Sequence, residues 1–385
     1  MEPQRKLVSF RTIAEVIPHT NADSLEIAVV DGWKCLVKKG EFNSGDRIIY
    51  FEIDSLIPVS EEFEFLRKYA YVNKSWMPEE LGVTEGFRIK TVKLRGELSQ
   101  GLVIPVPSTL KDKDDSYDLT EHFKVIKYEV PLSKGLTYCF TGGNSGKFPS
   151  FFPKTGETRI QNKFPSVQEN KDRHYEVTRK YHGMSISFYA KLANDLTWFE
   201  RTKLMFANWL GIEMKPIYRY GVCSHNVELD LSNSGNVFVD FANNSGIIDK
   251  LKIYVESNKE LPELAIQGEI CGPGIQDNHH GLDEICVFVF NIFDIKNNRY
   301  LLPVERATKF EEIFSSEFNP IIQEALVEFY TTVGDRTIDE IISLGEFTLP
   351  SGKPNEGFVW KAMNCDFSFK AISNEFLLSK NEQDE

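Results

Sequence analysis

The sequence predicts an α+β protein, in which a small antiparallel β-barrel precedes a larger domain of antiparallel sheets with flanking helices. Three observations support this prediction. The 385 residues exceed the length of one typical domain, so we expect two. The first hundred residues consist of short strand-like segments between turns. The remainder mixes strand-like and helix-like segments, as α+β domains do.

The amino-terminal part is rich in Val, Ile, Phe and Tyr. Its expected strands are VSFRTIAEVI, DGWKCLVKKG, DRIIYFEID, GFRIKTVKL and GLVIPV. We expect them to form a closed barrel, because closure removes exposed sheet edges. The first domain is assigned to residues 1–130, with an excursion between strands at 71–83 and a short helix at 118–127.

Residues 131–150 are rich in Gly, Ser and Pro and are predicted to be a linker. The second domain is assigned to residues 151–380. Its expected strands are YEVTRKYHGMSISFY, NVFVDF, ICVFVFNIFDI and EGFVWKAM, and its expected helices are TWFERTKLMFANWLG and NPIIQEALVEFYTTV. We expect the last six residues, KNEQDE, to be frayed.

Composition narrows the class of protein. Hydrophobic residues at 41% and charged residues at 26% are typical of a globular domain. There is no apolar run of about 20 residues and no secretory signal, so we expect no membrane association. Six separated cysteines without a CxxC pair indicate reduced thiols in an intracellular protein, cytoplasmic or nuclear. A net charge of −13 argues against nonspecific coating of nucleic acid.

The stretch IAEVIPHTNADSLEIAVVDGWKCLVKKGEFNSGDRIIYFEIDSLIP resembles an OB-type tRNA-binding domain, like that of the phenylalanine tRNA synthetase β chain. OB barrels bind single strands or ends by stacking and backbone charge. The candidates for such contacts are Trp33, Lys38, Lys39, Lys90, Lys93 and Arg95. The alternative is that Trp33 belongs to the core and the lysines are ordinary surface residues.

An ordered set of motifs follows the barrel. VTRKYHGMSISFY places Lys180 at a strand end, before a tight break at Gly183. The other motifs are PKTGETRIQN, GVCSHNVEL, QGEICGPGIQDN, VFVFNIFDI, NEGFVWK and SFKAIS. K-x-H-G alone is a weak signal, but the ordered set resembles the covalent nucleotidyltransferase superfamily of polynucleotide ligases and mRNA capping enzymes. In detail it is most similar to ATP-dependent RNA ligases that carry an OB domain before the nucleotidyltransferase (adenylyltransferase) domain, the family five RNA ligases.

The resemblance implies a role for each site residue. Lys180 would be the nucleophile that forms lysyl-AMP, with Lys370 and Arg159 as the other catalytic residues. The nucleotide-binding residues would be Lys180, Arg159, Glu269, Phe290, Lys370, Thr178, Ser185 and His225. The metal-binding residues, for Mg²⁺ or Mn²⁺, would be Glu356, Glu269 and His182. Phe290 is the first choice for stacking on adenine, and Phe288 the second.

Each of these residues has a structural alternative. Glu269 and Glu356 stand beside glycines and would also suit ordinary turns, and Phe288 and Phe290 would also suit a core. Arg159 would also suit an ion pair with a nearby glutamate.

Nucleophilic attack requires an uncharged amine, whereas a free lysine has a pKa of about 10.4. We expect Arg179, Lys370 and a metal ion to lower the pKa of Lys180. Four residues depart from the family pattern: Arg179 stands where an acidic residue is usual, His182 where Asp is usual, His225 where Arg is usual, and Ile372 where many ligases have the second lysine of a K-x-K pattern.

The resemblance therefore implies an ATP-dependent RNA ligase that seals 3′-OH/5′-phosphate breaks through lysyl-AMP and an adenylylated RNA 5′ end. Its expected partners are ATP and RNA, in the form of a nicked duplex, and we expect a monomer. One alternative is a DNA ligase or capping-type nucleotidyltransferase. These enzymes carry the OB domain after the catalytic domain, and only 15 residues follow Lys370. The other alternative is a noncatalytic OB-type tRNA/RNA-binding protein, which would carry no covalent AMP.

Overall fold

The computed structural model describes residues 6–73, 85–128, 146–193, 197–210, 216–258, 260–314 and 321–383. The amino-terminal part is built on a curled 5-stranded antiparallel sheet in the order β10-β4-β1-β2-β3. Its strands are β1 (Val8–Pro18), β2 (Leu25–Val30), β3 (Trp33–Lys38), β4 (Arg47–Phe51) and β10 (Leu102–Pro105). We call this part the half-barrel, because among the described residues β3 and β10 do not pair. The closed barrel expected from the sequence is therefore a curled, open one.

Smaller elements complete the half-barrel. A 4-stranded sheet has the order β11-β5-β7-β6, and β8 and β9 form a hairpin. Their bounds are β5 (Ser55–Ile57), β6 (Tyr71–Asn73), β7 (Glu85–Arg88), β8 (Thr91–Leu94), β9 (Glu97–Gln100) and β11 (Ile126–Lys127). The helices are η1 (Glu61–Leu66), α1 (Arg67–Ala70), η3 (Ser108–Leu110) and α2 (Leu119–His122). The expected strand GFRIKTVKL is thus two strands in different sheets, and the expected helix at 118–127 is the single turn α2, capped by the side chain of Asp118.

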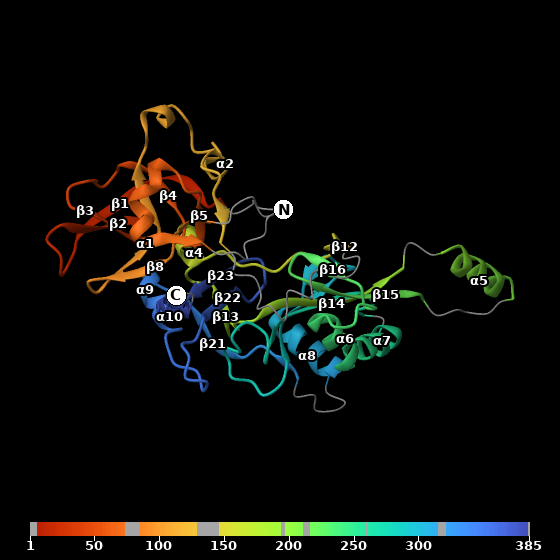
Figure 1. The fold of residues 1–385 in the computed structure, drawn as a ribbon. Coiled ribbons are helices and arrows are strands. Elements are labelled where there is room, and N and C mark those ends of the chain that lie inside the picture. Colours follow the sequence, from red (N-terminus) through yellow and green to blue (C-terminus); the bar gives the residue numbers. More distant parts are fainter. Residues whose placement is uncertain are drawn as a thin grey trace.

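The carboxy-terminal part contains two sheets with flanking helices (Figure 1), which are antiparallel except where the short strand β20 pairs parallel with β18. The larger contains β12 (Gly146–Lys147), β14 (Met184–Leu192), β15 (Tyr218–Ser224), β16 (Val227–Leu229), β17 (Leu264–Cys271), β18 (Cys286–Asp294), β19 (Arg299–Tyr300) and β20 (Ile322–Glu324). The smaller has the order β21-β13-β22-β23. It contains β13 (His174–Arg179), β21 (Val327–Thr332), β22 (Gly357–Ala362) and β23 (Ser368–Ile372).

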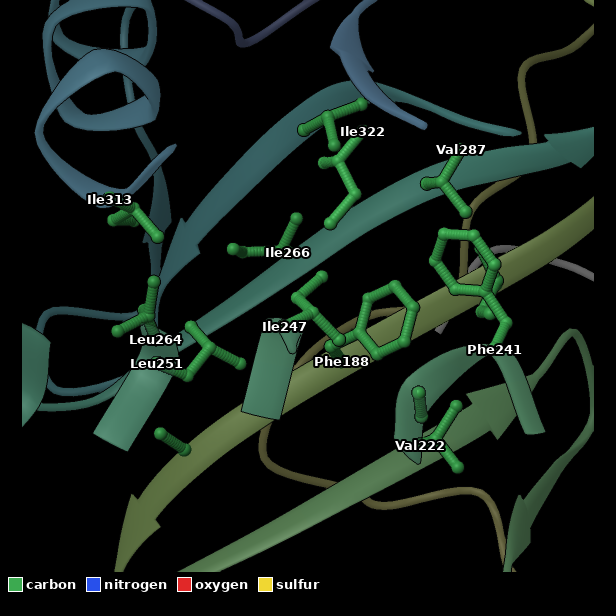
Figure 2. Packing of buried hydrophobic residues seen from close by; sticks show 14 of the residues in the cluster. Phe188, Val222, Phe241, Ile247, Leu251, Leu264, Ile266, Val287, Ile313 and Ile322 are labelled. Carbon is green, nitrogen blue, oxygen red and sulfur yellow. The ribbon is translucent and has the colours of Figure 1, made fainter. Parts of the chain in front are cut away.

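Seven helices are described in the carboxy-terminal part. They are α4 (Ile160–Glu169), α5 (Trp198–Trp209), α6 (Val237–Asn244), α7 (Ile247–Ser257), α8 (Pro303–Phe314), α9 (Ile338–Ser343) and α10 (Asn374–Gln383). Figure 2 shows how Phe188 of β14, Ile266 of β17 and Val287 of β18 pack with Ile247 and Leu251 of α7 in the core of the larger sheet. Burying one face of the sheet in this way leaves its other face for the smaller sheet and the segments between them.

Two predicted elements of the carboxy-terminal part are wrong. NVFVDF, expected as a strand, lies in helix α6, because the Asn236 side chain accepts hydrogen bonds from the backbone N–H groups of Phe238 and Val239 and so caps a helix. NPIIQEALVEFYTTV, expected as a helix, contains β20 and β21. These strands form because β18 and β13 offer free edges beside them, so tertiary pairing overrides the helical pattern.

Other expectations agree with the structure. The break at Gly183 separates β13 from β14. Helix α5 forms where expected and projects beyond β14 and β15 (Figure 1). Its apolar side chains Trp198, Phe199 and Trp209 are exposed. The described cysteines, Cys35, Cys223, Cys271, Cys286 and Cys365, are free thiols. The linker prediction falls mostly on residues outside those described. Across the described ranges, no helix is long and apolar enough to span a bilayer.

Candidate active site

The turn between β13 and β14 places Lys180 between the two carboxy-terminal sheets. The backbone N–H of Lys180 donates to the carbonyl of Gly357, 3.0 Å away, which extends the pairing of β13 with β22 by one residue. The turn then closes tightly on β17, because a Cβ atom at Gly183 would lie 2.2 Å from the carbonyl oxygen of Ile270. Only glycine fits this approach.

Two carboxylates lie beside Lys180. Its Nζ atom is 2.9 Å from Oε1 of Glu356, the residue that precedes β22. Glu269, on β17, accepts a hydrogen bond of 3.2 Å from the backbone N–H of Gly183. Strand pairing places Glu269 opposite Ser185. The site therefore gathers residues that are far apart in the sequence.

The protonation state of Lys180 depends on the carboxylates of Glu356 and Glu269. Burial alone would lower the pKa of Lys180, but Glu356 and Glu269 outweigh burial and raise that pKa above its ordinary value. Burial alone would raise the pKa of Glu356, but Lys180 and His182 hold it well below its usual range. Burial raises the pKa of Glu269 to about 7. The expectation that the side chains of Arg179 and Lys370 lower the pKa of Lys180 is therefore wrong for this arrangement of charges, and the effect expected of a metal ion stays a prediction.

Arg179 does not act on Lys180 as expected. Successive strand residues point to opposite faces, so the two side chains diverge. The Nε–H of Arg179 donates to Oε1 of Glu328, 2.7 Å away on β21, and its guanidinium lies 5.4 Å from the ring centre of Phe347. The positive charge of Arg179 is thus paired with a carboxylate in the smaller sheet.

Lys370 and Arg159 lie side by side. The two form an isolated parallel bridge, and the backbone N–H of Lys370 donates to the carbonyl of Thr158 at 2.9 Å. Arg159 is the N-cap residue of α4. Burial, together with the charges of Lys180 and Arg159, lowers the pKa of Lys370 to about 8. Two cationic side chains thus come next to the Lys180–Glu356 pair.

His182 contacts Glu356 from the other side. Its Nδ1 atom is 3.6 Å from Oε2 of Glu356, and its Nε2 atom contacts Nζ of Lys380. Burial lowers the pKa of His182, and the nearby ammonium groups lower it further. Lys380 belongs to α10, so the prediction that the residues from 380 onward are frayed is wrong for this residue. The ring of Phe376 packs 5.1 Å from that of His182 and explains why the helix is held here.

The aromatic candidates differ in their surroundings. Phe288 is paired with Glu269 across the strands, so both side chains point to the same face. Its ring is buried and stacks on Tyr181, with 3.8 Å between centroids and 9° between planes. Phe290 is only half-buried at the margin of the same cluster. Phe290 is thus the more accessible of the two for stacking on a base.

The remaining nucleotide-binding candidates surround the turn. Thr178 is buried on β13, two residues before Lys180 and on the same face. The hydroxyl oxygen of Ser185 is 2.9 Å from that of Thr155. His225 is exposed, one residue beyond Ser224, which pairs with Ile186. His225 therefore lies at the same end of the sheet as Ser185.

The proposed metal-binding residues fit a water-held ion. Oε2 of Glu356 is buried and has no hydrogen-bond partner in the described structure. Within the ranges that the structure describes, no three His, Cys, Asp or Glu side chains form a ready-made chelating group. Mg²⁺ keeps several of its waters when it binds proteins, so a carboxylate oxygen without a partner suits it.

Comparison with known proteins agrees with this geometry. The family model described as an OB-fold domain matches residues 7–106, and the model described as RNA ligase matches residues 173–372. The chain belongs to the RNA ligase family. No curated protein matches the ligase in sequence.

Solved structures of an RNA ligase from Naegleria gruberi match the ligase over its whole length. A mutant of that enzyme without ligand is 31% identical, covers 99% of both chains and has a TM-score of 0.79. A mutant with AMP and Mn is 31% identical, covers 99% of the ligase and 100% of its own chain, and has a TM-score of 0.80. The enzyme with PPi is 32% identical with the same coverage and a TM-score of 0.80. These matches exclude the noncatalytic RNA-binding alternative, because the ligase model covers the second part of the chain.

Sequence reasoning missed several residues of the site. Lys380 carried no signal, because it lies in a polar tail. Lys361 ends the NEGFVWK motif and was not singled out, yet its Nζ donates to the carbonyl of Phe290 at 3.2 Å.

Trp33, a candidate for RNA stacking, is fully buried and donates from Nε1 to Oδ1 of Asn162 at 2.6 Å. The core alternative is the correct one for Trp33.

Proposed function

We propose that this ligase joins RNA ends through an AMP carried on Lys180. Nζ of Lys180 gives up a proton and attacks the α-phosphorus of ATP, and the bond to pyrophosphate breaks. An oxygen of an RNA 5′-phosphate then attacks the same phosphorus and breaks the P–N bond. Finally, an RNA 3′-hydroxyl attacks the 5′-phosphate, AMP leaves and the strand is sealed. In-line transfers of this kind depend mainly on positioning and charge neutralisation.

One observation carries the proposal: Lys180 and Glu356 lie 2.9 Å apart, beside the cationic pair Lys370 and Arg159. A structural lysine needs only its carboxylate partner. Of the two further cations next to it, Lys370 has a pKa lowered by burial and by its cationic neighbours, so an anion bound there would stabilise its charge, and the phosphates of ATP are such an anion. The solved structures of the Naegleria gruberi enzyme with AMP and Mn and with PPi support the same assignment.

The other candidates follow from their positions. We assign Lys370 and Arg159 to the phosphates, and Glu269 to the ribose hydroxyls, since a carboxylate accepts from both. Phe290 is assigned to adenine. Thr178, Ser185 and His225 are assigned to the rim of the nucleotide site.

Mg²⁺ or Mn²⁺ would be held by Glu356, with Glu269 and His182 near it. When bound, such an ion neutralises charge on the phosphates. Oε2 of Glu356 supports this assignment, because it is buried, makes no hydrogen bond with the described residues and has Nδ1 of His182 3.6 Å away. An imidazole is a poorer partner than a carboxylate for hydrated Mg²⁺, so His182 favours Mn²⁺ over Mg²⁺.

We propose a nicked duplex with RNA on the 3′-OH side as substrate, bound in part by the half-barrel. Lys38, Lys39, Lys93 and Arg95 are exposed there and are available to phosphates. We propose a monomer as the working unit.

Labelled ATP tests the proposal directly. With label at the α-phosphate and Mg²⁺ or Mn²⁺ present, the wild-type chain should retain label on a denaturing gel and Lys180→Met should retain none. Lys191→Met is the matched control, because Lys191 lies near the far end of β14, where it pairs with Glu263 away from the site. Label from γ-labelled ATP, or label on Lys180→Met, would contradict the mechanism.

Nicked duplexes test the substrate. The four duplexes with RNA or DNA on either side of the nick should be compared at equal concentration. We expect sealing to require RNA on the 3′-OH side. Equal sealing of an all-DNA nick would favour a DNA ligase.

A further inference from the structure

The half-barrel contacts the ligase sheets at the beginning of α4. Asn162, in the first turn of this helix, makes a hydrogen bond with each polar atom of its side-chain amide. Oδ1 accepts from Trp33 Nε1 at 2.6 Å, and Nδ2 donates to Oε1 of Glu52 at 2.9 Å. Trp33 and Glu52 are both buried. A Cβ atom at Gly32 would lie 2.9 Å from Cα of Gln161, so the two backbones are in close contact. The half-barrel therefore sets the position of the start of α4.

Arg159 occupies the N-cap position of α4, and the half-barrel contacts it as well. Oδ2 of Asp54 lies 3.5 Å from Nη2 of Arg159, and the two side chains are 30% and 12% exposed. The guanidinium carbon is 5.8 Å from the ring centre of Trp33. Asp54 stands in the turn between β4 and β5.

The backbone holds Asp54 in one orientation. Its φ angle is 69°, in the left-handed region that few residues other than Gly, Asn and Asp adopt. Its N–H donates to the carbonyl of Ile89 at 2.8 Å, and its carbonyl accepts from the N–H of Tyr128 at 2.7 Å. The backbone of Asp54 is thus fixed by the half-barrel, and its carboxylate contacts a residue outside the half-barrel.

We propose that Asp54 is a positioning residue that aims the guanidinium of Arg159 at the phosphates of ATP and of the RNA 5′ end. On its other side Arg159 bridges to Lys370, so its backbone is fixed by the ligase sheet and its side chain by the half-barrel. A guanidinium has five N–H donors on three nitrogens, so one guanidinium can contact a carboxylate and phosphate oxygens at the same time. The half-barrel then contributes to AMP transfer itself and not only to RNA binding. This inference rests on the role proposed above for Arg159.

A double-mutant cycle on the full-length chain tests the inference. Asp54→Gly removes the carboxylate and adopts a φ of 69° without strain. We expect it to slow self-adenylylation and AMP transfer to RNA by roughly 3- to 30-fold in the wild-type background. In the Arg159→Ala background, Asp54→Gly should change neither rate further. Asp54→Asn, which also tolerates this φ and keeps an acceptor oxygen, should recover part of the rate.

Asp339→Ala is the matched control. Asp339 pairs with Lys34 at 2.5 Å and joins α9 to β3 at the same interface, without involving Arg159. It should leave both rates at the wild-type level. Equal slowing by Asp54→Gly and Asp339→Ala would show a general effect of the interface and overturn the inference.

Other outcomes separate the inference from the function on which it rests. If Asp54→Gly slows the Arg159→Ala enzyme by the same factor as the wild type, Asp54 does not act through Arg159 and the inference is wrong. If Arg159→Ala adenylylates itself and transfers AMP at the wild-type rates, the proposed role of Arg159 fails first. If Arg159→Ala is slow and Asp54→Gly matches the wild type, only the inference fails.

Discussion

Nζ of Lys180 lies 2.9 Å from Oε1 of Glu356, and the two side chains are only 23% and 10% exposed. The pair lowers the energy of two buried charges, but it also holds the nucleophile in its protonated form. Attack on ATP therefore requires that the charges around Lys180 be rearranged. The phosphates, a metal ion and the neighbouring cations are the groups available to do this.

The first prediction concerns this pair. Glu356→Gln should lower the pKa of Lys180, because the ammonium loses its main favourable charge interaction. Mass spectrometry measures the rate at which acetic anhydride labels Lys180 at each pH, without ATP or metal. The pH at which this rate rises should be lower in Glu356→Gln than in the wild type. Glu263→Gln, which removes the partner of Lys191, is the control and should leave the Lys180 profile in place. A Lys180 profile that does not move with Glu356→Gln would show that the carboxylate does not govern its protonation.

The second prediction concerns the charge of Lys370, whose pKa is lowered to about 8. Below that pH the side chain is cationic and binds phosphate; above it the charge is lost. The rate of self-adenylylation at subsaturating ATP, which reports the free enzyme, should therefore bend downward near pH 8. Lys370→Arg keeps its charge throughout, so this bend should disappear even if the overall rate falls by about tenfold. If the wild type and Lys370→Arg show the same bend, a titrating group other than Lys370 causes it.

The third prediction separates the two phenylalanines of β18. Phe288→Ala should lower the free energy of unfolding by about 3–5 kcal/mol, because it removes a buried ring stacked on Tyr181. Phe290→Ala should instead raise the ATP concentration for half-maximal self-adenylylation by about tenfold or more, since stacking on a base contributes about 1–3 kcal/mol. Urea denaturation and a titration with ATP measure the two effects. The adenine assignment is wrong if Phe290→Ala changes stability and leaves ATP binding unaltered.

The fourth prediction concerns Gly183. Gly183→Ala would place a methyl group 2.2 Å from the carbonyl oxygen of Ile270, and backbone atoms cannot move aside cheaply. We expect a loss of about 1–3 kcal/mol of stability and a large fall in self-adenylylation, because the turn that carries Lys180 must shift. Gly156→Ala is the control, since a Cβ there meets nothing within 4 Å. Full activity of Gly183→Ala would mean that the turn tolerates the displacement.

The fifth prediction distinguishes the buried tryptophan from the surface cations of the half-barrel. Trp33→Phe should lose about 1 kcal/mol of stability with the hydrogen bond to Asn162 and leave RNA affinity unchanged. Lys93→Glu combined with Arg95→Glu should weaken binding to a nicked duplex and reduce its salt dependence. Fluorescence anisotropy at several salt concentrations measures both. Unchanged RNA affinity in the charge-reversal variant would show that the hairpin of β8 and β9 is not part of the RNA-binding site.

The sequence alone determined the α+β class, the order of the two parts and the position of Lys180 before the break at Gly183. These features depend on local information: strand-favouring residues, turn chemistry and motifs whose members stand in a set order. Local patterns were insufficient where pairing decided the outcome. The segment 319–333 has helical spacing, but β20 and β21 form within it because β18 and β13 present edges to it.

Only the tertiary structure decided the charges and the contacts of the site. Whether Lys180 is neutral or charged depends on two carboxylates that the fold brings to it from β17 and from the start of β22. The contact of Asp54 with Arg159, and that of Lys380 with His182, join residues more than a hundred positions apart. Such contacts depend on how separate elements pack, because electrostatic interactions vary with distance and burial, and no spacing along the chain encodes either.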